Sequence, residues 1–337
     1  MAAMFKYLVI VSPLGFLYGS AGAFLSPENL VGRSGAKFPP DAATLAGLFF
    51  SENKQNAIAP QATLRNELFV AGPFWAKQGN EENFYVPLPR HRIIEDGRDD
   101  EWKLNTKRQW ERDANKQNIE SEYRWQTIDS WTRPKTSDIR NNKEVSSAPW
   151  EYVSFLHPQM KTDERHVLAE KGLFLENAVQ IDDDFCLVYL STFPLNDGWY
   201  RFGGEGHFVE ITCQSIEPES SIHELLKPDN KINHACALIT PGVWGSNHLS
   251  HRYPKQPDFP KEGIKMLTDK AIPYRYRSRG KLGRGRYAVP PGTVYVFKKP
   301  LEKTWWEFPE EWFPKEGFPL KHLGCGLCLP VQINGAV

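Results

Sequence analysis

Cysteine is scarce in this chain. The 337 residues contain only five, scattered at Cys186, Cys213, Cys236, Cys325 and Cys328. An odd, scattered set argues against the disulfide framework of a secreted protein and for reduced thiols in the cytoplasm. The C-x-x-C of Cys325 and Cys328 could bind zinc together with His234 and Cys236. However, no second C-x-x-C follows at finger spacing, and the apolar, glycine-rich GCGLC suits a buried strand or tight turn, so we predict no metal site.

Net charge is absent as well. The chain has 41 basic and 41 acidic residues, whereas a dedicated nucleic-acid-binding domain is usually basic overall. A site for RNA must therefore come from local clustering of positive charge. Hydrophobic residues make up 40% of the chain, which is enough to bury a core, and the length suggests two domains.

Long apolar runs are also missing. No stretch reaches about 18 apolar residues, so we predict no membrane span. The N-terminal run YLVIVSPLGFLYGSAGAFL has features of a secretory signal with a small-residue cleavage site. However, Ser12, Pro13 and Gly15 interrupt it, and its β-branched first part, residues 7–11, suits a buried strand that ends at the proline. We favour the strand, and with it a cytoplasmic protein.

Motifs of common catalytic sites do not occur either. The chain has no Walker A lysine motif, no H-E-x-x-H and no G-x-S-x-G. Any one of His157, His248 and His251 could act as general base in metal-free RNA cleavage, but no partner for it is identified. We therefore predict a protein that is not an enzyme and needs no cofactor.

A long loop follows the first strand. It is rich in glycine, carries Arg33 and Lys37, and ends at residue 40. A loop of this length is usually functional or an interface, although an Ω-loop packed on its own phenylalanines is equally consistent. Asp41 fits the N-cap of a helix over residues 42–50. Short strands are expected at residues 68–74 and 83–86.

The middle of the chain changes character. Residues 89–145 are dense in both charges and contain four tryptophans: Trp102, Trp110, Trp125 and Trp131. This mixed-charge insertion is either an arm that becomes ordered against partners or a solvated surface excursion. Beyond it, a strand is expected at residues 185–190, directly after Asp182, Asp183 and Asp184. Neighbouring residues on a strand point to opposite faces, so we predict a solvated turn rather than a metal site there.

A glycine-rich loop follows Arg201. Three glycines in four positions, Gly203, Gly204 and Gly206, would let the backbone approach a ligand and turn its N–H groups toward an anion. Glu205 could bond a ribose hydroxyl or hold the loop in place. Such a loop alone is a weak signal, but we include Arg201 and the loop among the candidate RNA-binding residues.

The most basic segment runs YRYRSRGKLGRGRYAVPPGTVYVF, from Tyr274 to Phe297, and no acidic residue occurs between residues 270 and 301. On an extended strand Arg275, Arg277 and Arg279 share one face, and Tyr274, Tyr276 and Ser278 share the other. A basic edge strand protected from aggregation would also look like this, but glycines and tyrosines beside the arginines favour RNA. We predict RNA contacts from Arg275, Arg277, Arg279, Lys281, Arg284 and Arg286. No RNP1 or KH motif supports base readout.

Four stretches in this order resemble a known family. They are LGFLYGSAGAFLSPENLVGRSGAKFPPDAATLAGLFF, the GGEGH loop, AVPPGTVYVF and the closing GCGLCLP. Together they look like the RAMP-superfamily subunit, third in the Cmr series, of type III-B CRISPR effector complexes. The similarity covers most of the chain and is weakest at the insertion.

The resemblance implies an α+β fold of two ferredoxin-like (RRM-like) domains with glycine-rich loops, at residues 1–160 and 161–337, the first containing the insertion at about 89–145. It also implies a non-catalytic subunit that binds the 5′ handle of the CRISPR RNA (crRNA), holds the large polymerase-like subunit and the adjacent RAMP backbone subunit, and meets target RNA only indirectly. The handle-binding positions carried over are Arg33, Ser34, Lys37, Gly203, Gly204 and Glu205.

Two alternatives remain open from the sequence. The first is a metal-free RAMP endoribonuclease that processes precursor crRNA with a histidine as base. The second is a purely protein-binding scaffold, in which the basic segment meets an acidic patch of the large subunit.

Overall fold

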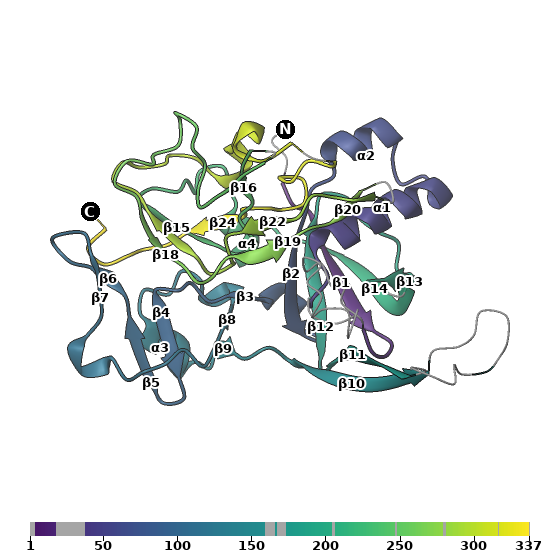
Figure 1. The fold of residues 1–337 in the computed structure, drawn as a ribbon, viewed down its shortest axis with the longest axis horizontal. Helices are drawn as coiled ribbons and strands as arrows, with labels where there is room; N and C mark the ends of the chain where they lie inside the picture. The colour runs from purple at the N-terminus through teal and green to yellow at the C-terminus, as the bar shows by residue number, and fades with distance from the viewer. Residues whose placement is uncertain are drawn as a thin grey trace.

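The protein is an α+β chain dominated by antiparallel sheets (Figure 1). The computed structural model describes residues 4–17, 38–158, 166, 173–203, 206–246, 248–278, 281–315 and 317–336. Two large sheets contribute to one continuous hydrophobic core. No helix among these residues is long and apolar enough to cross a bilayer.

The first sheet has eight strands and is centred on the N-terminal strand. Its four central strands lie in the order β14-β1-β12-β2 with every pairing antiparallel. Their bounds are Tyr7–Pro13 for β1, Val70–Lys77 for β2, Phe185–Ser191 for β12 and His207–Ser215 for β14. Residues 8–11 of β1 are at most 4% exposed, because a central strand covered on both faces needs apolar side chains on both. The strands predicted at 7–11 and 185–190 are confirmed.

The predicted helix is also present. Helix α1 (Ala42–Asn56) links β1 to β2, and Leu45 and Phe49 on it are fully buried. It packs against β2 and β13 (Gly198–Phe202). Asp41 occupies the N-cap position, although its side chain makes no capping hydrogen bond. A shorter helix, α2 (Gln61–Glu67), follows.

Further strands extend both edges of this sheet. One edge carries β3 (Tyr85–Pro87), β8 (Trp125–Thr127) and β9 (Val145–Ser146), and the other carries β13. Trp75 and Tyr85 face each other across β2 and β3, with ring centroids 3.8 Å apart and nearly parallel planes. Stacked cross-strand aromatic pairs of this kind stabilise a sheet edge.

Most of the insertion predicted at 89–145 folds as a lobe beside β3 (Figure 1), and the rest supplies β8 and the start of β9 to the eight-stranded sheet. The lobe contains four short strands and one α-helix: β4 (Arg92–Glu95), β5 (Arg98–Glu101), β6 (Lys103–Leu104), β7 (Trp110–Glu111) and α3 (Thr136–Asn141). Leu88, Ile94 and Ile139 form a small core of their own. The dense charges pair with one another, for example Arg112 with Asp100 at 2.6 Å. The lobe therefore folds on itself, and its role toward partners stays a prediction.

The second large sheet has four strands in the order β18-β23-β15-β24. Their bounds are Lys265–Leu267, Val294–Val296, Ala235–Leu238 and Cys328–Pro330. Trp305 is 1% exposed and contacts residues that precede a strand of each sheet. Its ring stacks on Phe5, before β1, with centroids 5.9 Å apart, and its Nε1 donates to the carbonyl of Cys325, before β24, at 3.2 Å. A short helix, α4 (Ser221–Leu225), lies between the sheets in sequence.

The two large sheets draw their strands from different parts of the chain. The eight-stranded sheet takes strands from both sides of residue 160, and the four-stranded sheet begins only at Ala235. Between β12 and β14 the described residues contain strand β13 and no helix. The α+β class is confirmed, whereas the boundary at residue 160 and the two ferredoxin-like domains stay predictions.

Both cysteines of the C-x-x-C segment are buried. Cys325 Sγ donates to the hydroxyl of Tyr274 at 3.2 Å, and Cys328 begins β24. Burial raises the pKa of the Cys328 thiol well above its usual value, which disfavours the thiolate that a metal needs. Gly326 has φ +68°, and a Cβ there would collide with the ring of Trp244. Among the described residues, no three or more His, Cys, Asp or Glu side chains are placed to hold a metal ion.

A two-stranded ribbon stands apart from both large sheets. It consists of β10 (Trp150–Pro158) and β11 (Leu173–Ile181), and Figure 1 shows it projecting at the lower right. Leu17 and Val179 exchange two backbone hydrogen bonds, of 3.0 and 2.8 Å, which tie the base of the ribbon to the chain just after β1. Tyr152 and Leu156 on β10 are 51% and 67% exposed.

Candidate nucleic-acid interface

The basic segment folds back on itself. The sequence predicted one basic strand followed by a loop, but the chain forms a long hairpin from four short strands: β19 (Ile272–Tyr274), β20 (Arg277–Ser278), β21 (Lys281–Leu282) and β22 (Arg286–Ala288). Strand β19 pairs with β22, and β20 pairs with β21. Between these pairs, the amide of Gly283 donates to the carbonyl of Tyr276 at 2.9 Å. The basic residues consequently stand on two arms rather than in one row.

The tyrosines anchor this hairpin. Tyr274 and Tyr276 are 4% and 8% exposed. The hydroxyl of Tyr276 donates to the carbonyl of Phe318 at 2.8 Å. The predicted alternation holds over residues 274–277. The two tyrosines are buried, whereas Arg275 between them is half-buried and Arg277 after them is exposed.

The arginines of the hairpin differ in exposure. Arg286 is 5% exposed and donates to the carbonyl of Ser246 at 2.9 Å. Arg275 donates from Nε to the carbonyl of Gly283 at 2.6 Å. Arg277 and Arg284 are exposed. The first two therefore brace the hairpin, and the last two offer charge to solvent.

Arg284 has a histidine beside it. Its Nη1 lies 2.8 Å from Nδ1 of His248, which lies in the loop between β16 (Trp244–Gly245) and β17 (Ser250–His251). Arg279 lies outside the described residues, and so does the side chain of Lys281. An RNA contact from these basic residues stays a prediction.

The second glycine loop joins β13 to β14. Gly203 and Gly206 have φ of 81° and 67°, a left-handed backbone that glycine adopts without strain. Gly204 and Glu205 lie outside the described residues, as do Arg33, Ser34 and Lys37 of the first loop. The RNA contacts predicted for all of them remain predictions.

The hairpin beside this loop carries an exposed aromatic surface that the sequence analysis missed. Trp199, Arg201 and Phe208 share one face, because Arg201 is two residues from Trp199 and pairs directly with Phe208 across the strands. Trp199 is 72% exposed and Phe208 is 52% exposed. The Arg201 guanidinium lies 5.4 Å from the centroid of the Phe208 ring. We call these three residues the aromatic platform. In the sequence, this surface could have been predicted from the W-x-R spacing of Trp199 and Arg201 and from the phenylalanine after the glycine loop.

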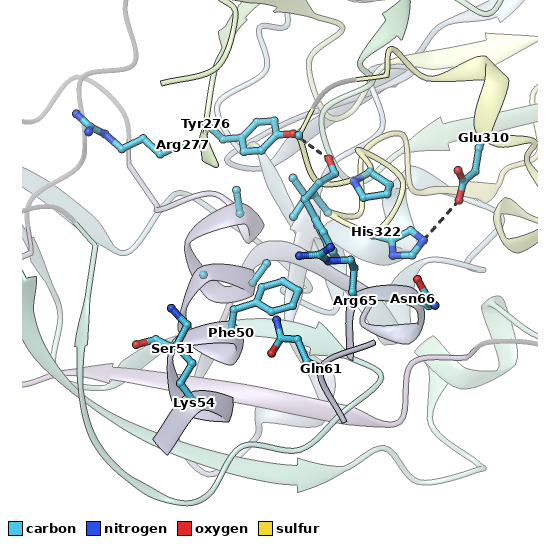
Figure 2. A pocket seen from close by; sticks show the side chains of 17 residues that line it. Phe50, Ser51, Lys54, Gln61, Arg65, Asn66, Tyr276, Arg277, Glu310 and His322 are labelled. Atoms are coloured by element: carbon cyan, nitrogen blue, oxygen red, sulfur yellow. Dashed lines mark hydrogen bonds and ion pairs between the residues drawn. The ribbon is translucent and has the colours of Figure 1, made fainter. Parts of the chain in front are cut away.

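A basic cleft of about 940 Å³ is lined on one side by α1. Figure 2 shows Lys54 and Arg65 on the α1 and α2 side and Tyr276 and Arg277 on the opposite side. The two side chains on the helices are exposed and were not among the predicted residues. Because α1 both contacts β13 and lines this cleft, it lies between the aromatic platform and the exposed arginine of β20.

The floor of the cleft is held by buried polar groups. His322 stacks on Phe69 with centroids 3.9 Å apart, and its Nε2 lies 3.6 Å from a carboxylate oxygen of Glu310. Burial lowers the pKa of His322, and the Glu310 charge opposes that shift. Lys321 donates to the carbonyls of Trp306 and Phe308 at 2.8 and 2.6 Å. These bonds fix the C-terminal wall in place.

Comparison with known proteins gives one family. A family model described as CRISPR-associated protein (Cas_Cmr3) matches residues 16–332. No curated protein matches the chain.

Solved structures align over most of the chain. One is a chain of "Cryo-EM structure of the Type III-B Cmr-beta bound to cognate target RNA", with 12% identity, a TM-score of 0.46 and 86% of each chain covered. Another belongs to "Crystal structure of Csm3-Csm4 subcomplex in the type III-A CRISPR-Cas interference complex", with 12% identity, a TM-score of 0.43, and 97% of this chain and 99% of that chain covered. At these scores the alignments carry no argument.

The matched range includes the GGEGH loop, AVPPGTVYVF and GCGLCLP, and all but the first two residues of the N-terminal stretch that carries the resemblance. This chain belongs to the Cas_Cmr3 family of CRISPR-associated proteins.

Proposed function

We propose that this chain is a non-catalytic, cytoplasmic subunit of a type III-B CRISPR effector complex. In this proposal it binds the 5′ handle of the crRNA and bridges the large polymerase-like subunit to the adjacent RAMP backbone subunit. It meets target RNA only through the guide. Membership in the Cas_Cmr3 family supports the setting, and the surface chemistry supports the role.

The observation that carries the proposal is the aromatic platform. Two large aromatic side chains more than half exposed are unusual in the absence of a partner, since burying them would remove apolar area from water. Aromatic rings next to a guanidinium provide faces on which unpaired bases stack and a charge for the neighbouring phosphate. Single-stranded RNA needs both, whereas a purely protein interface needs no cation over the ring.

Further exposed basic side chains lie across α1 from the aromatic platform. Lys54 lies on α1 and Arg65 on α2, and they line a cleft with Arg277 of β20. Arg284 lies on the returning arm of the same hairpin. Contacts of this kind neutralise phosphates without reading sequence, so they would position a short single strand rather than select its bases. The bases of the handle would then be held at the aromatic platform.

The central strands support a ferredoxin-like unit in this role. Strands β1 and β2 with α1 between them, followed by β12 and β14, supply the four strands and the first helix of a βαββαβ unit. Strand β13 takes the position in sequence of the second helix and carries Trp199 and Arg201 of the aromatic platform. The glycine loop therefore sits at the edge where the unit departs from the regular pattern.

The β10–β11 ribbon is our candidate for the contact with the neighbouring backbone subunit. Tyr152, Ser154 and Leu156 alternate on one exposed face of β10. A projecting two-stranded ribbon with apolar side chains on an outer face fits into a groove of a partner protein. This contact and the RNA contact use different surfaces and can be separated by substitution.

Binding to short RNAs tests the proposal. The full chain is titrated with a labelled 5′-handle oligonucleotide and with a shuffled oligonucleotide of the same composition and length. The handle should bind several-fold more tightly, and Trp199→Ala should remove most of that difference. Equal affinity for the two RNAs, unchanged by Trp199→Ala, would refute handle recognition and leave a protein-binding scaffold as the better account.

A further inference from the structure

A second cleft, of about 880 Å³, lies between the insertion lobe and the four-stranded sheet. Its walls come from residues 87–93, 117–125, 267–269 and 290–291. In Figure 1 the lobe that forms one wall lies on the opposite side of the molecule from α1 and β20. The cleft is therefore separate from the surfaces assigned above to the crRNA handle.

Its lining is basic. Four arginines line the cleft against two carboxylates, those of Glu120 and Asp269: the arginines are Arg90, Arg92, Arg112 and Arg124. Arg112 is already paired with Asp100 at 2.6 Å, and Arg90 with Asp269 at 3.2 Å. The side chain of Arg124 is exposed and makes no hydrogen bond or ion pair to any described residue. The cleft consequently keeps an excess of positive charge.

Arg92 gives a second indication of an anionic ligand. It is 7% exposed, and its two terminal nitrogens donate to Gln126 Oε1 at 3.0 Å and to the carbonyl of Arg133 at 2.6 Å. Its Nε, and the Nε of Arg90, are buried without an acceptor among the described residues. Buried donors that lack an acceptor are destabilising, so an acceptor supplied by a ligand would be favourable there.

Two of the arginines repel each other across the cleft. Burial lowers the pKa of Arg90, Asp269 opposes this, and the charge of Arg124 lowers it further. The same Arg124 charge contributes to the lowered pKa of Asp269. An anion between Arg90 and Arg124 would relieve their repulsion.

The cleft also presents aromatic rings. Trp102, Tyr123 and Trp125 line it, and each is partly exposed. The Arg112 guanidinium lies 5.7 Å from the Trp102 ring centroid, so a cation and an aromatic ring already stand together. An acidic peptide would match the arginines but leave the rings unused. A nucleotide matches both, with its phosphate on the guanidiniums and its base on a ring.

We propose that this cleft is a second RNA site, which holds one or two nucleotides of a single strand. The phosphate lies between Arg90 and Arg124, and the base lies against Tyr123 or Trp125. The site uses no residue of the aromatic platform or of the basic hairpin. It therefore stands whether or not those surfaces bind the crRNA handle.

The first test is crosslinking. The full chain is irradiated with short oligouridylates that contain one 4-thiouridine, and the tryptic peptides that carry RNA are identified. We expect crosslinks in one of two tryptic peptides: residues 117–124, which contain Tyr123, or residues 125–135, which begin with Trp125. Crosslinks that never fall in residues 117–135 would overturn the proposal.

The second test compares two charge reversals in the same lobe. Arg124→Glu alters the cleft, and Lys107→Glu alters an exposed lysine outside its lining with the same change in charge. Both are made in a chain that already carries Trp199→Ala and Arg277→Ala, which suppresses the proposed handle site. We expect Arg124→Glu to weaken oligouridylate binding roughly fivefold or more and to reduce its salt dependence. Lys107→Glu should change affinity by less than about twofold, as expected for a surface charge far from the bound phosphate.

The outcomes separate the two proposals. Equal effects of Arg124→Glu and Lys107→Glu would refute the second site. Binding of polyglutamate that depends on Arg124, with no binding of oligouridylate, would refute it too and assign the cleft to an acidic protein segment. If Trp199→Ala and Arg277→Ala leave handle affinity unchanged, the proposed handle site fails and the second site is unaffected.

Discussion

The guanidinium of Arg201 lies over the ring of Phe208, 5.4 Å from its centroid, at directly paired positions of β13 and β14. Exposed contacts of this kind contribute about 0.5–1 kcal/mol, too little to explain two large exposed aromatic residues by folding alone. The pair orients the guanidinium beside the turn at Gly203. The arrangement gives RNA a charge and a stacking surface on one rigid hairpin.

The aromatic platform should account for much of the RNA affinity. Trp199→Ala and Phe208→Ala each remove one stacking surface, and stacking of a base on an aromatic ring contributes about 1–3 kcal/mol. We therefore expect each variant to bind handle RNA between about fivefold and a hundredfold more weakly, measured by fluorescence anisotropy. Tyr152→Ala, which removes an equally exposed ring from β10, is the control and should bind RNA normally. A similar loss in the control would contradict the prediction.

The arginines of the hairpin should fall into two classes. Arg277→Ala and Arg284→Ala should each reduce the log–log salt slope of RNA binding by about one, with unfolding free energy within about 0.5 kcal/mol of the parent. Arg286→Ala removes a buried donor from the carbonyl of Ser246 and should destabilise the fold by about 1–3 kcal/mol. Salt titrations and denaturant unfolding check both parts. Loss of stability in the exposed variants, with none in Arg286→Ala, would show that the assignments are reversed.

The ribbon should act in assembly and not in RNA binding. Tyr152→Ala together with Leu156→Ala removes two side chains more than half exposed, so folding should change little. The few side chains that dominate an interface each contribute about 2 kcal/mol or more, or about 30-fold in affinity. We expect the double variant to lose co-purification of the adjacent backbone subunit, with Trp199→Ala as the matched control. Normal assembly of the double variant would exclude the ribbon from that contact.

Lys321 predicts a specific dependence of stability on pH. Burial lowers the pKa of Lys321 from 10.5 to about 8, and Glu310 opposes the shift. Between these two values the unfolded chain binds more protons at this lysine than the folded chain. The contribution of Lys321 to the free energy of unfolding therefore becomes more favourable as pH rises from about 8 toward 10.5.

This dependence is measured as a difference between two proteins. Unfolding free energies of the parent and of Lys321→Met are compared from pH 7.5 to 9.5, so that tyrosines and other groups cancel. The parent should gain stability relative to the variant across this range. A constant difference would mean that the amine keeps its ordinary pKa and is not desolvated.

The local structure of the basic segment could be predicted only in part. Alternation placed Tyr274 and Tyr276 inward, because a period of two holds for any extended arm. It could not show that the chain reverses between Ser278 and Lys281, since glycines with this spacing fit a strand as well as a hairpin. The burial of Arg286 depends on the carbonyl of Ser246, 40 residues away, and no local pattern encodes that contact.

The aromatic platform could not be predicted from local sequence patterns either. Trp199 and Phe208 meet only because β13 and β14 pair in one register, and a slip of one residue would turn Phe208 to the other face. The sequence drew attention to the glycines between these strands, whose conformational freedom is a local property. The central strand at β1 and the helix α1 were predictable because apolar runs and caps are local as well.

Crosslinking in the assembled particle tests the central claim most directly. The guide RNA carries one photoreactive nucleotide, either in the 5′ handle or near the 3′ end, and the crosslinked peptides of this subunit are mapped. The account predicts that handle probes crosslink to residues 199–208 and to the hairpin of residues 274–288. Crosslinks to this subunit from the 3′ end alone would contradict it.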